Sequence, residues 1–369
     1  MTDARATVDA YLQALIASGT ERGIQIAAYV DGRLVLDTWA GVADDETGRM
    51  VDGDTLFTIY SATKGIVATA IHMLVERGRL RYDAPIAEYW PEFAANGKGA
   101  ITLRHALSHQ AGIPRLPPGT TRFDQTNWDK MVATIAGLTP EWPAGTRTEY
   151  HGLTIGHTVG EVLRRVDGRT VHDFIHQEIG RTLGIADLNV GVPPEKEARV
   201  ALLRDAVQPP GPNGPLPSTA GAMNLSETRR AMLPSSGGIA NARSLARMYA
   251  MLDGGGILDG VRLLRPETIA SATVPHTAPE DGRREEVNFA LGYRCGGTYF
   301  SYPSLLRAMS TRPTVFGHSG AGGIMAFADP ERRFAMAMTH NLLRHPEPEI
   351  EFPTVGIVRV VRTAVGVAD

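Results

Sequence analysis

Hydrophobic residues at helical spacing open the chain. In residues 5–18 apolar positions recur every three or four residues, which predicts an amphipathic helix that ends before Gly19. Two apolar runs follow, residues 23–30 and 34–41, and they flank the pair Asp31-Gly32. Because this pair favours the positive φ angles of a two-residue turn, the pattern predicts a β-hairpin.

The pattern changes at residue 61. Residues 61–75 (SATKGIVATAIHMLV) are apolar nearly all round and long enough for a helix, so we expect a buried one. From about residue 78 to residue 235 the chain is predicted to be mostly helical. Two segments rich in Pro and Gly interrupt this part, residues 111–119 and 209–217, and the second has five prolines in nine residues, which excludes regular structure.

Strand-like runs return near the C-terminus. A helix is predicted at about residues 243–253 and a last helix at residues 351–365, and between them lie four apolar runs at 288–295, 314–320, 323–330 and 334–342. Strands near both ends around a helical middle predict an α/β (α+β) fold. One lobe, residues 1–77 and 236–369, would hold a sheet built from both termini. Residues 78–235 would form an inserted, mostly helical lobe, with the active site at the seam.

Composition excludes several classes of protein. A net charge of −3 gives no electrostatic footprint for nucleic acid. The single cysteine, Cys295, excludes an internal disulfide framework and a Cys-rich zinc site, and we expect it to be a small buried residue. No apolar stretch reaches the length of a membrane span, and the N-terminus lacks the pattern of a signal peptide. We therefore expect a cytoplasmic protein.

Lysine is scarce in this chain. The 37 basic residues comprise 33 Arg and only four Lys. Lys98, Lys130 and Lys196 lie in polar sequence, where we expect loops and where Arg could serve. Lys64 lies in the apolar run 61–75, and a Lys there can release its proton, which an Arg cannot.

Ser61 and Lys64 are the first candidates for chemistry. Their spacing is nearly one helical turn, so both side chains would lie on one helix face. A neighbouring base activates a hydroxyl as a nucleophile, and burial favours the neutral form of a Lys. The alternative is a surface Ser near a surface Lys, but a Lys in an apolar helix is costly unless it has a function.

With this motif the chain resembles the serine β-lactamase and penicillin-binding-protein superfamily, in its esterase-like branch related to class C β-lactamases and family VIII carboxylesterases. Two further landmarks occur in the expected order, Tyr150-His151-Gly152 and His318-Ser319-Gly320. The segments 102–114 and 235–248 are also similar to family segments. The resemblance implies a β-lactamase/transpeptidase-like fold with a central antiparallel sheet flanked by helices.

The resemblance also implies roles for these residues. Ser61 would be the nucleophile, and Lys64 and Tyr150 would share the work of general base and general acid. The backbone N–H groups of Ser61 and Ala321 would form the oxyanion hole. The substrate would lie against a set of small and polar residues: Gly152, His318, Ser319, Gly320 and Gly322. Gly320, Gly322 and Gly323 would let the strand edge approach it closely. No cofactor and no metal is implied.

Three departures from the family pattern bear on the substrate. His318 stands where members that recognise β-lactams have Lys, and it is largely neutral at its ordinary pKa. Gly152 stands where Asn or Ser is usual, and Ala321 where the esterase branch commonly has Trp. The first two changes remove polar anchors for the substrate. The missing Trp predicts a roomier entrance to the active site. The expected function is a carboxylesterase that forms an acyl-enzyme with small neutral esters or thioesters.

Other functions stay open at this point. The same site could serve an acyltransferase with an alcohol or amine acceptor, or a β-lactamase or D-amino-acid peptidase. The least favoured alternative is a binding protein without catalysis. The pairs His105/His109 and His172/His176 have spacing compatible with zinc, but structural hydrogen bonds and a partly exposed helix face are the better interpretations. The oligomeric state is open.

Overall fold

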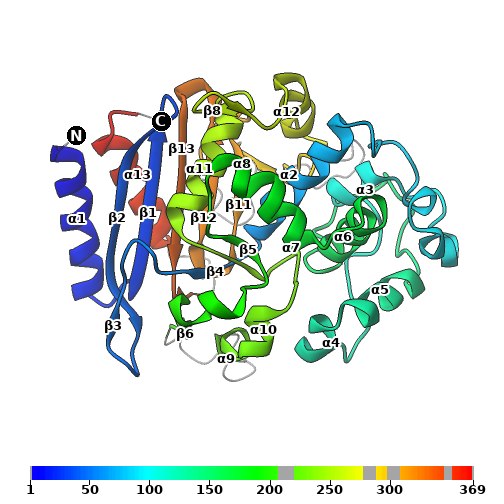
Figure 1. Ribbon diagram of the computed structural model, residues 1–369, viewed down its shortest axis with the longest axis horizontal. Helices are drawn as coiled ribbons and strands as arrows, with labels where there is room; N and C mark the ends of the chain where they lie inside the picture. Colours follow the sequence, from blue (N-terminus) through cyan, green and yellow to red (C-terminus); the bar gives the residue numbers. More distant parts are fainter. Residues whose placement is uncertain (1, 207–219, 277–287, 297–307, 345–350, 368–369) are drawn as a thin grey trace.

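The computed structural model of the chain describes residues 2–206, 220–276, 288–296, 308–344 and 351–367. Its centre is a seven-stranded sheet in the order β10-β11-β12-β13-β1-β2-β3 (Figure 1). Every neighbouring pair of strands is antiparallel. The strands are β1 (Gly23–Val30), β2 (Arg33–Asp44), β3 (Arg49–Met50), β10 (Arg294–Cys295), β11 (Phe316–Ser319), β12 (Met325–Asp329) and β13 (Phe334–His340).

The sheet joins the two ends of the chain. Strand β1 pairs with β13 along its length, from Ile24 opposite His340 to Val30 opposite Phe334. Helices flank the sheet on both faces, so the predicted α/β class with a central antiparallel sheet is confirmed. The boundaries of the two lobes, at residues 77 and 235, stay a prediction.

The predicted hairpin is confirmed as β1 and β2. Asp31 and Gly32 connect the strands with φ angles of +50° and +72°. Both residues therefore adopt the left-handed region that a two-residue turn of this kind requires, which explains why Asp-Gly stands here.

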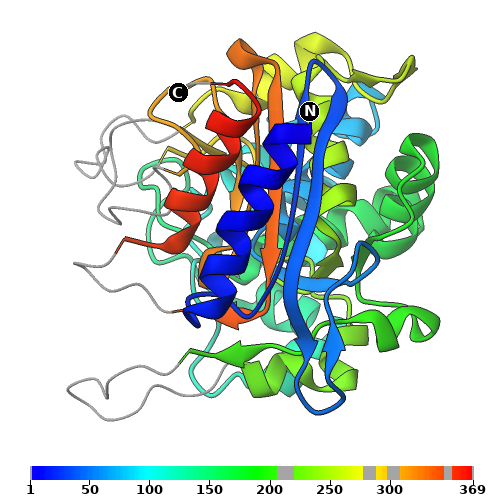
Figure 2. The ribbon, with the colours of Figure 1, turned by 90° about the vertical axis from the view of Figure 1, so that its left-hand side faces the viewer.

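Two helices from opposite ends of the chain cover the outer face of the sheet. Helix α1 (Thr2–Ala17) and helix α13 (Pro353–Ala364) lie side by side on it, as Figure 2 shows, and both were predicted. Large side chains of the sheet pack against them in one cluster, among them Ile24, Ile26, Met325, Phe327, Met336 and Met338.

The inner face of the sheet presents small residues instead. Along β12 and β13 large residues alternate with alanine, and Ala326, Ala328, Ala335 and Ala337 belong to the other core cluster. Helix α11 (Ala242–Asp253) packs on this face, against β1, β12 and β13. Small side chains let a helix approach a sheet closely. The alternation of large residues with alanine along β12 and β13 therefore determines how close α11 lies to the sheet.

Helix α2 (Thr63–Glu76) is buried from Thr63 to Leu74, as predicted. Gly65 of this helix faces Tyr249 of α11, and a Cβ atom on Gly65 would lie 2.2 Å from the Tyr249 hydroxyl. The loop at 111–119 has no regular structure, also as predicted, and the segment at 209–217 lies outside the described residues. In the described part of the chain no helix is long and apolar enough to cross a membrane.

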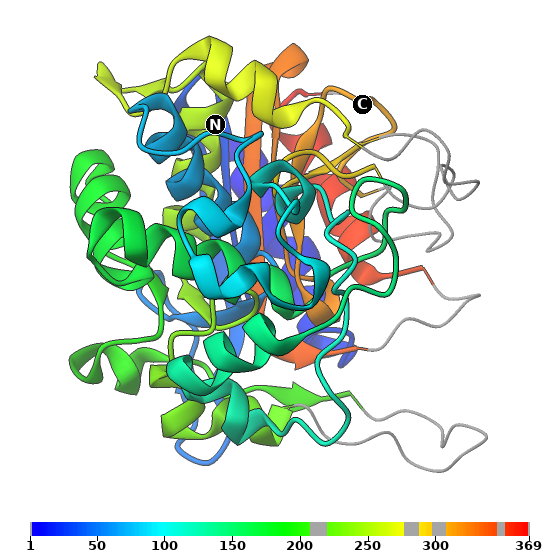
Figure 3. The ribbon, with the colours of Figure 1, turned by 90° about the vertical axis from the view of Figure 1, so that its right-hand side faces the viewer.

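Helices of the middle segment cover the side of the molecule away from α1 (Figure 3). They are η1 (Ile86–Glu88), η2 (Pro91–Gly97), α3 (Leu103–Leu107), α4 (Arg122–Thr126), α5 (Trp128–Gly137), α6 (Thr154–Asp167), α7 (Val171–Phe174), η3 (Ile175–Gly180), α8 (Arg181–Leu183), η4 (Pro194–Arg199), α9 (Ala220–Asn224) and α10 (Ser226–Arg230). Helix α12 (Pro266–Thr273) follows α11. Helices therefore outnumber strands among the described residues of this segment, and its assignment to a separate, mostly helical lobe stays a prediction.

Short strands complete the fold. Strand β7 (Gly238–Ala240) lies between β4 (Phe57–Tyr60) and β5 (Leu188–Val190) in a three-stranded sheet. The sequence did not predict β5, because three residues are too few for an alternating pattern. The remaining strands pair as β6 (Arg204–Asp205) with β14 (Leu342–Leu343) and β8 (Ile257–Leu258) with β9 (Val261–Arg262).

Lys98 corrects one sequence interpretation. It was expected in a polar loop, but its side chain is fully buried, and its amine donates to the carbonyl oxygens of Ala95 at 2.7 Å, Ala136 at 2.9 Å and Leu138. Ala136 belongs to the end of α5 and Leu138 follows it, so the ammonium satisfies free carbonyls at a helix C-terminus. Cys295 is buried, as predicted.

The buried carboxyl of Asp253, at the end of α11, makes the stability of the core depend on pH. Its side chain is 6% exposed and its Oδ1 atom has no hydrogen-bond partner among the described residues. The pKa of Asp253 is raised to about 7, mainly by burial; Arg333 opposes this rise, and the nearby Asp329 and Asp31 add to it. Between about pH 4 and pH 7 the folded protein keeps a proton that the unfolded chain loses, so the free energy of unfolding falls as pH rises through this window.

We therefore expect Asp253→Asn to stabilise the protein at pH 8, by on the order of a few kcal/mol, and to stabilise it by less than half as much at pH 5. Thermal unfolding at both pH values measures this difference. Asp129→Asn, at an exposed position, serves as the control and should have the same effect at both pH values. An equal effect of Asp253→Asn at pH 5 and pH 8 would contradict the assignment.

Candidate active site

Ser61 lies in a strained turn between β4 and α2. The residue before it, Tyr60, has a φ angle of +46°, which is rare for a residue with a large side chain. Two hydrogen bonds fix the turn: the Thr63 hydroxyl donates to the Tyr60 carbonyl at 2.5 Å, and the Gly238 N–H donates to the Thr63 hydroxyl at 2.8 Å. The turn is thus held by strand β7 and leaves Ser61 partly exposed at the start of the buried helix.

Lys64 lies one turn further along the helix and is only 3% exposed. Its amine donates to the Ser61 hydroxyl at 3.2 Å and to the Ser235 carbonyl at 2.9 Å. Burial lowers the pKa of Lys64, and the charge of Arg294 acts in the same direction, while Tyr150 opposes them. The geometry brings the two residues together as the sequence predicts, with the amine biased toward its neutral form.

Tyr150 lies between two cations. The Lys64 amine is 5.0 Å from the centre of its ring and the Arg294 guanidinium carbon is 4.8 Å from it. The ring of Phe289 is parallel to it at 5.8 Å. Burial alone would raise the pKa of Tyr150, but the charges of Lys64 and Arg294 outweigh burial and lower it to about 8. Its buried hydroxyl has no hydrogen-bond partner of normal geometry among the described residues, although Lys64 and Ser61 lie close enough to favour the phenolate.

His318 lies on β11 beside this group. It is 1% exposed, its ring is 6.4 Å from that of Tyr150, and its Nδ1 donates to the Ser319 carbonyl at 2.7 Å. Burial, together with the charges of Arg294 and Lys64, lowers the pKa of His318 well below its usual value. The ring is therefore neutral at pH 7, in agreement with the sequence expectation. Its Nε2 atom has no partner in the described part of the chain.

The end of β11 meets the turn that holds Ser61. A Cβ atom on Gly320 would lie 2.4 Å from the Ile59 carbonyl, so only glycine allows this approach. The next residue, Ala321, is exposed. In the described turns neither the Ser61 N–H nor the Ala321 N–H donates to a backbone carbonyl. Both amides therefore remain available as donors.

The other glycines of this segment pack against the protein itself. Gly322 has a φ angle of +85°, and a Cβ atom there would lie 2.9 Å from the Leu343 side chain. On Gly323 it would lie 2.6 Å from the Thr354 hydroxyl. These contacts within the protein are sufficient to explain why glycine stands at both positions, without the close approach to a substrate that the sequence predicts. At Gly152 a Cβ atom would be in ordinary contact with the Tyr150 ring, at 3.4 Å.

Sequence reasoning missed two members of this group. Ser235 accepts from Lys64 through its carbonyl, and its hydroxyl links Leu153 and Gly156, at 2.9 Å each. Arg294 brings a guanidinium onto the Tyr150 ring. The sequence indicated Ser235 only weakly, because this residue begins a segment that is similar to a family segment. Nothing in the sequence distinguishes Arg294 from the 32 other arginines.

The remaining histidines have structural surroundings. The His105 ring accepts from the Thr102 N–H at 3.2 Å, and the His109 ring accepts from the His151 N–H at 3.0 Å, as the sequence interpretation favoured. His172 and His176 stack at 6.2 Å on a partly exposed face. Among the described residues no group of three His, Cys, Asp or Glu could hold a metal ion.

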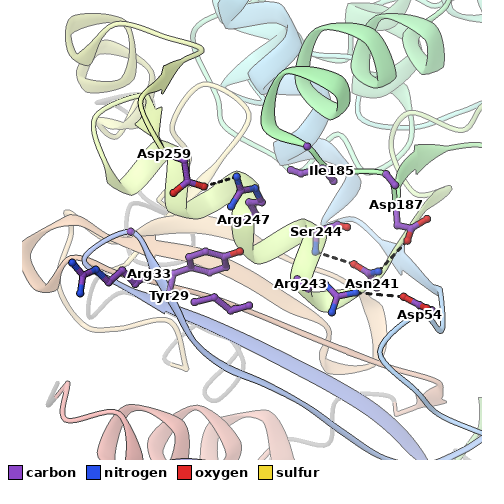
Figure 4. A pocket seen from close by; sticks show the side chains of 14 residues that line it. Tyr29, Arg33, Asp54, Ile185, Asp187, Asn241, Arg243, Ser244, Arg247 and Asp259 are labelled. Atoms are coloured by element: carbon purple, nitrogen blue, oxygen red, sulfur yellow. Dashed lines mark hydrogen bonds and ion pairs between the residues drawn. The ribbon is translucent and has the colours of Figure 1, made fainter. Parts of the chain in front are cut away.

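A separate pocket of about 660 Å³ lies between the β1–β2 hairpin and α11 (Figure 4). Two arginines of its lining pair with aspartates of the lining: Arg247 contacts Asp259 at 2.6 Å, and Arg243 contacts Asp54 at 3.4 Å. Ser61, Lys64 and Tyr150 are not among its lining residues. This pocket is thus distinct from the candidate active site, and the arginines that α11 contributes are already neutralised.

Comparison with known proteins agrees with this arrangement. The family model described as beta-lactamase matches residues 8–355. The chain belongs to the beta-lactamase family. It is 32% identical to "Esterase/beta-lactamase LipL" of Mycobacterium tuberculosis, over 93% of this chain and 82% of that protein. The resemblance to the esterase-like branch of the serine β-lactamase superfamily is confirmed, and with it the expectation of a serine hydrolase.

Solved structures of this family share the fold. A family VIII carboxylesterase is 30% identical, with a TM-score of 0.86 over 98% of this chain and 97% of that chain. A penicillin-binding-protein homologue from Caulobacter crescentus is 34% identical, with a TM-score of 0.84 over 99% of this chain and 97% of that chain. The β-lactamase/transpeptidase-like fold is therefore confirmed over nearly the whole chain.

The contact between Gly320 and Ile59 gives a test of this site. We expect Gly320→Ala to push β11 away from the Ser61 turn and to lower kcat/KM for an ester by about 10²-fold, because a displacement of about 1 Å at a reacting group has this order of effect. Gly137→Ala, at a position where a Cβ atom would meet nothing within 4 Å, is the matched control. Full activity of Gly320→Ala in a protein with unchanged thermal stability would show that the close approach has no role.

Proposed function

We propose that this protein is a serine carboxylesterase that hydrolyses small esters or thioesters through an acyl-enzyme on Ser61. The observation that carries the proposal is the hydrogen bond from the buried Lys64 amine to the Ser61 hydroxyl, beside a tyrosine whose pKa is lowered to about 8. A hydroxyl needs such a base to become a nucleophile. The names of the relatives, which include esterase and carboxylesterase, support the same class of reaction.

The proposed reaction has two steps. First the Ser61 oxygen attacks the ester carbonyl, its proton passes to the Lys64–Tyr150 pair, and the N–H groups of Ser61 and Ala321 stabilise the negative oxygen. The carbon–oxygen bond to the alcohol then breaks, and the pair returns the proton to the leaving oxygen. In the second step a water molecule attacks the acyl-enzyme by the same route, which releases the acid and regenerates Ser61.

The variant Lys64→Arg tests whether Lys64 takes part in proton transfer or serves only as a positive charge that stabilises the structure. Arg keeps the positive charge but cannot release its proton, so we expect kcat/KM for 4-nitrophenyl butyrate to fall by about 10²–10⁴-fold. Ser61→Ala should abolish both hydrolysis and labelling by a fluorophosphonate. The matched control is Lys130→Arg, at an exposed lysine that pairs with Asp124, and it should retain full activity. Hydrolysis by Ser61→Ala at the wild-type rate would exclude the proposed nucleophile.

The pH dependence of kcat/KM tests the base. Below its pKa the phenol of Tyr150 holds its proton and cannot accept another, so activity should rise with pH along a limb centred near pH 8, which belongs to the coupled Lys64–Tyr150 pair. Initial rates with a neutral ester between pH 6 and pH 10 measure this limb. A profile that is flat over that range would contradict the assignment.

A further inference from the structure

An apolar cavity lies at the opposite end of β11 from the candidate active site. It has a volume of about 440 Å³ and is formed by the end of α11, the start of β11, the turn after β12 and helix α12, which lies at the top of Figure 1. Strand β11 runs from this cavity, at Phe316, toward Ser319 and the site of Ser61. A cavity of this size can hold a small organic molecule.

The walls of this cavity are mostly hydrocarbon. The apolar lining residues are Leu252, Pro266, Ile269, Val274, Pro313 and Phe316. Three polar side chains also line it, and two of them have partners: the Thr273 hydroxyl donates to the Ile269 carbonyl at 2.9 Å, and the Thr314 hydroxyl donates to Glu331 at 2.6 Å. The third is the carboxyl of Asp253.

The Asp253 carboxyl has no partner among the described residues. Asp253 is only 6% exposed, its Oδ1 atom is buried without a hydrogen bond, and no described residue donates to its Oδ2 atom. An unpaired carboxylate is costly in apolar surroundings, which is why the pKa of Asp253 is raised to about 7. Above this pH the cavity wall carries a negative charge that the fold does not compensate.

The charged groups nearest to Asp253 are paired with one another. Those that shift its pKa are Arg333, Asp329 and Asp31. Arg333 pairs with Asp31 at 3.3 Å, and Asp329 pairs with Arg362 at 2.9 Å. Arg333 therefore opposes the rise in pKa from a distance but forms no contact with the Asp253 carboxyl.

Other charged groups reach only the rim of the cavity. Arg262 donates to the Gly255 carbonyl at 3.2 Å, and Arg312 lies 3.7 Å from Glu331. None of these three charges contributes to the pKa of Asp253. In the described part of the chain no cation therefore contacts this carboxylate, and a ligand would have to supply one.

We propose that this cavity binds a small organic amine in its protonated form, with the ammonium on the Asp253 carboxylate and the apolar body against the hydrocarbon walls. Ammonium N–H groups form short, charge-assisted hydrogen bonds to a carboxylate, and the walls remove the rest of the ligand from water. A metal ion would need several oxygen ligands, and the cavity offers one free carboxyl. The inference does not depend on the proposed function, because Ser61, Lys64 and Tyr150 are not among the described lining residues.

Three probes separate the charge of the ligand from its apolar body. Benzylammonium has both, benzyl alcohol has the apolar body alone, and methylammonium has the charge alone. Calorimetry at pH 8 measures the Kd of each probe for the wild type, for Asp253→Asn and for the control Asp129→Asn, at an exposed position. Asn keeps the size of the side chain and removes its charge.

We expect the wild type to bind benzylammonium about tenfold or more tighter than benzyl alcohol, and methylammonium more weakly than either. Asp253→Asn should lose this preference, and Asp129→Asn should keep it. Equal binding of the two benzyl compounds to the wild type, methylammonium binding as tight as that of benzylammonium, or a preference that survives in Asp253→Asn would overturn the proposal.

The preference should also depend on pH. Between pH 5 and pH 8 the Asp253 carboxyl loses its proton while benzylammonium keeps its own, so the affinity for benzylammonium should rise with pH. The affinity for benzyl alcohol should change little. The same preference at pH 5 and pH 8 would contradict the role given to the carboxylate.

Two variants of neighbouring residues on α12 locate the ligand. Ala270 lines the cavity and is exposed, so Ala270→Phe should fill part of it and weaken the binding of both benzyl compounds by about tenfold or more. Ser271 is also exposed but is not among the described lining residues, so Ser271→Phe should leave binding unchanged. Unchanged binding to Ala270→Phe would place the ligand elsewhere and overturn the proposal, whatever the esterase activity.

Discussion

The buried amine of Lys64 is the constraint on which the rest of this structure depends. An ammonium group in an apolar helix is unfavourable unless polar atoms surround it, and here the Ser61 hydroxyl and the Ser235 carbonyl do so. Each partner is in turn held by other elements: the Ser61 turn by β7, and Ser235 by the start of α6. Placing one amine therefore fixes how β4, α2, α6 and β7 meet, and the site lies where they meet.

The core supplies the precision that this arrangement needs. Alanines on the inner face of the sheet give α11 a close fit, the large residues of the outer face pack against α1 and α13, and Gly65 of α2 leaves room for the Tyr249 hydroxyl of α11. The end of β11 then reaches the Ser61 turn through Gly320. A close-packed interior resists small shifts, so in the proposed reaction the amides of Ser61 and Ala321 and the hydroxyl of Tyr150 would be held in place before a substrate arrives.

Two cations set the protonation of the proposed base. Arg294 and Lys64 lower the pKa of Tyr150 against the effect of burial, and no described carboxylate opposes them at Lys64 or His318. The sequence led to neutral esters, since the motif at residue 318 has lost its lysine. Arg294 places a guanidinium over the Tyr150 ring from a strand that the motif does not include.

Local patterns determined much of this protein. The hairpin at Asp31-Gly32, the buried helix after Ser61, the strands that carry alternating alanines and the order of the three motifs are all readable because they depend on neighbours in the sequence. What only the tertiary structure decided depends on partners far along the chain. The sequence around Lys98 is typical of an exposed lysine, and only the fold shows that the end of α5 surrounds it. Nothing in the sequence distinguishes Arg294 from the other arginines among the 33, and only the fold places it, on β10, over the Tyr150 ring. Burial and charge pairing are properties of the assembled fold, so no local pattern could reveal them.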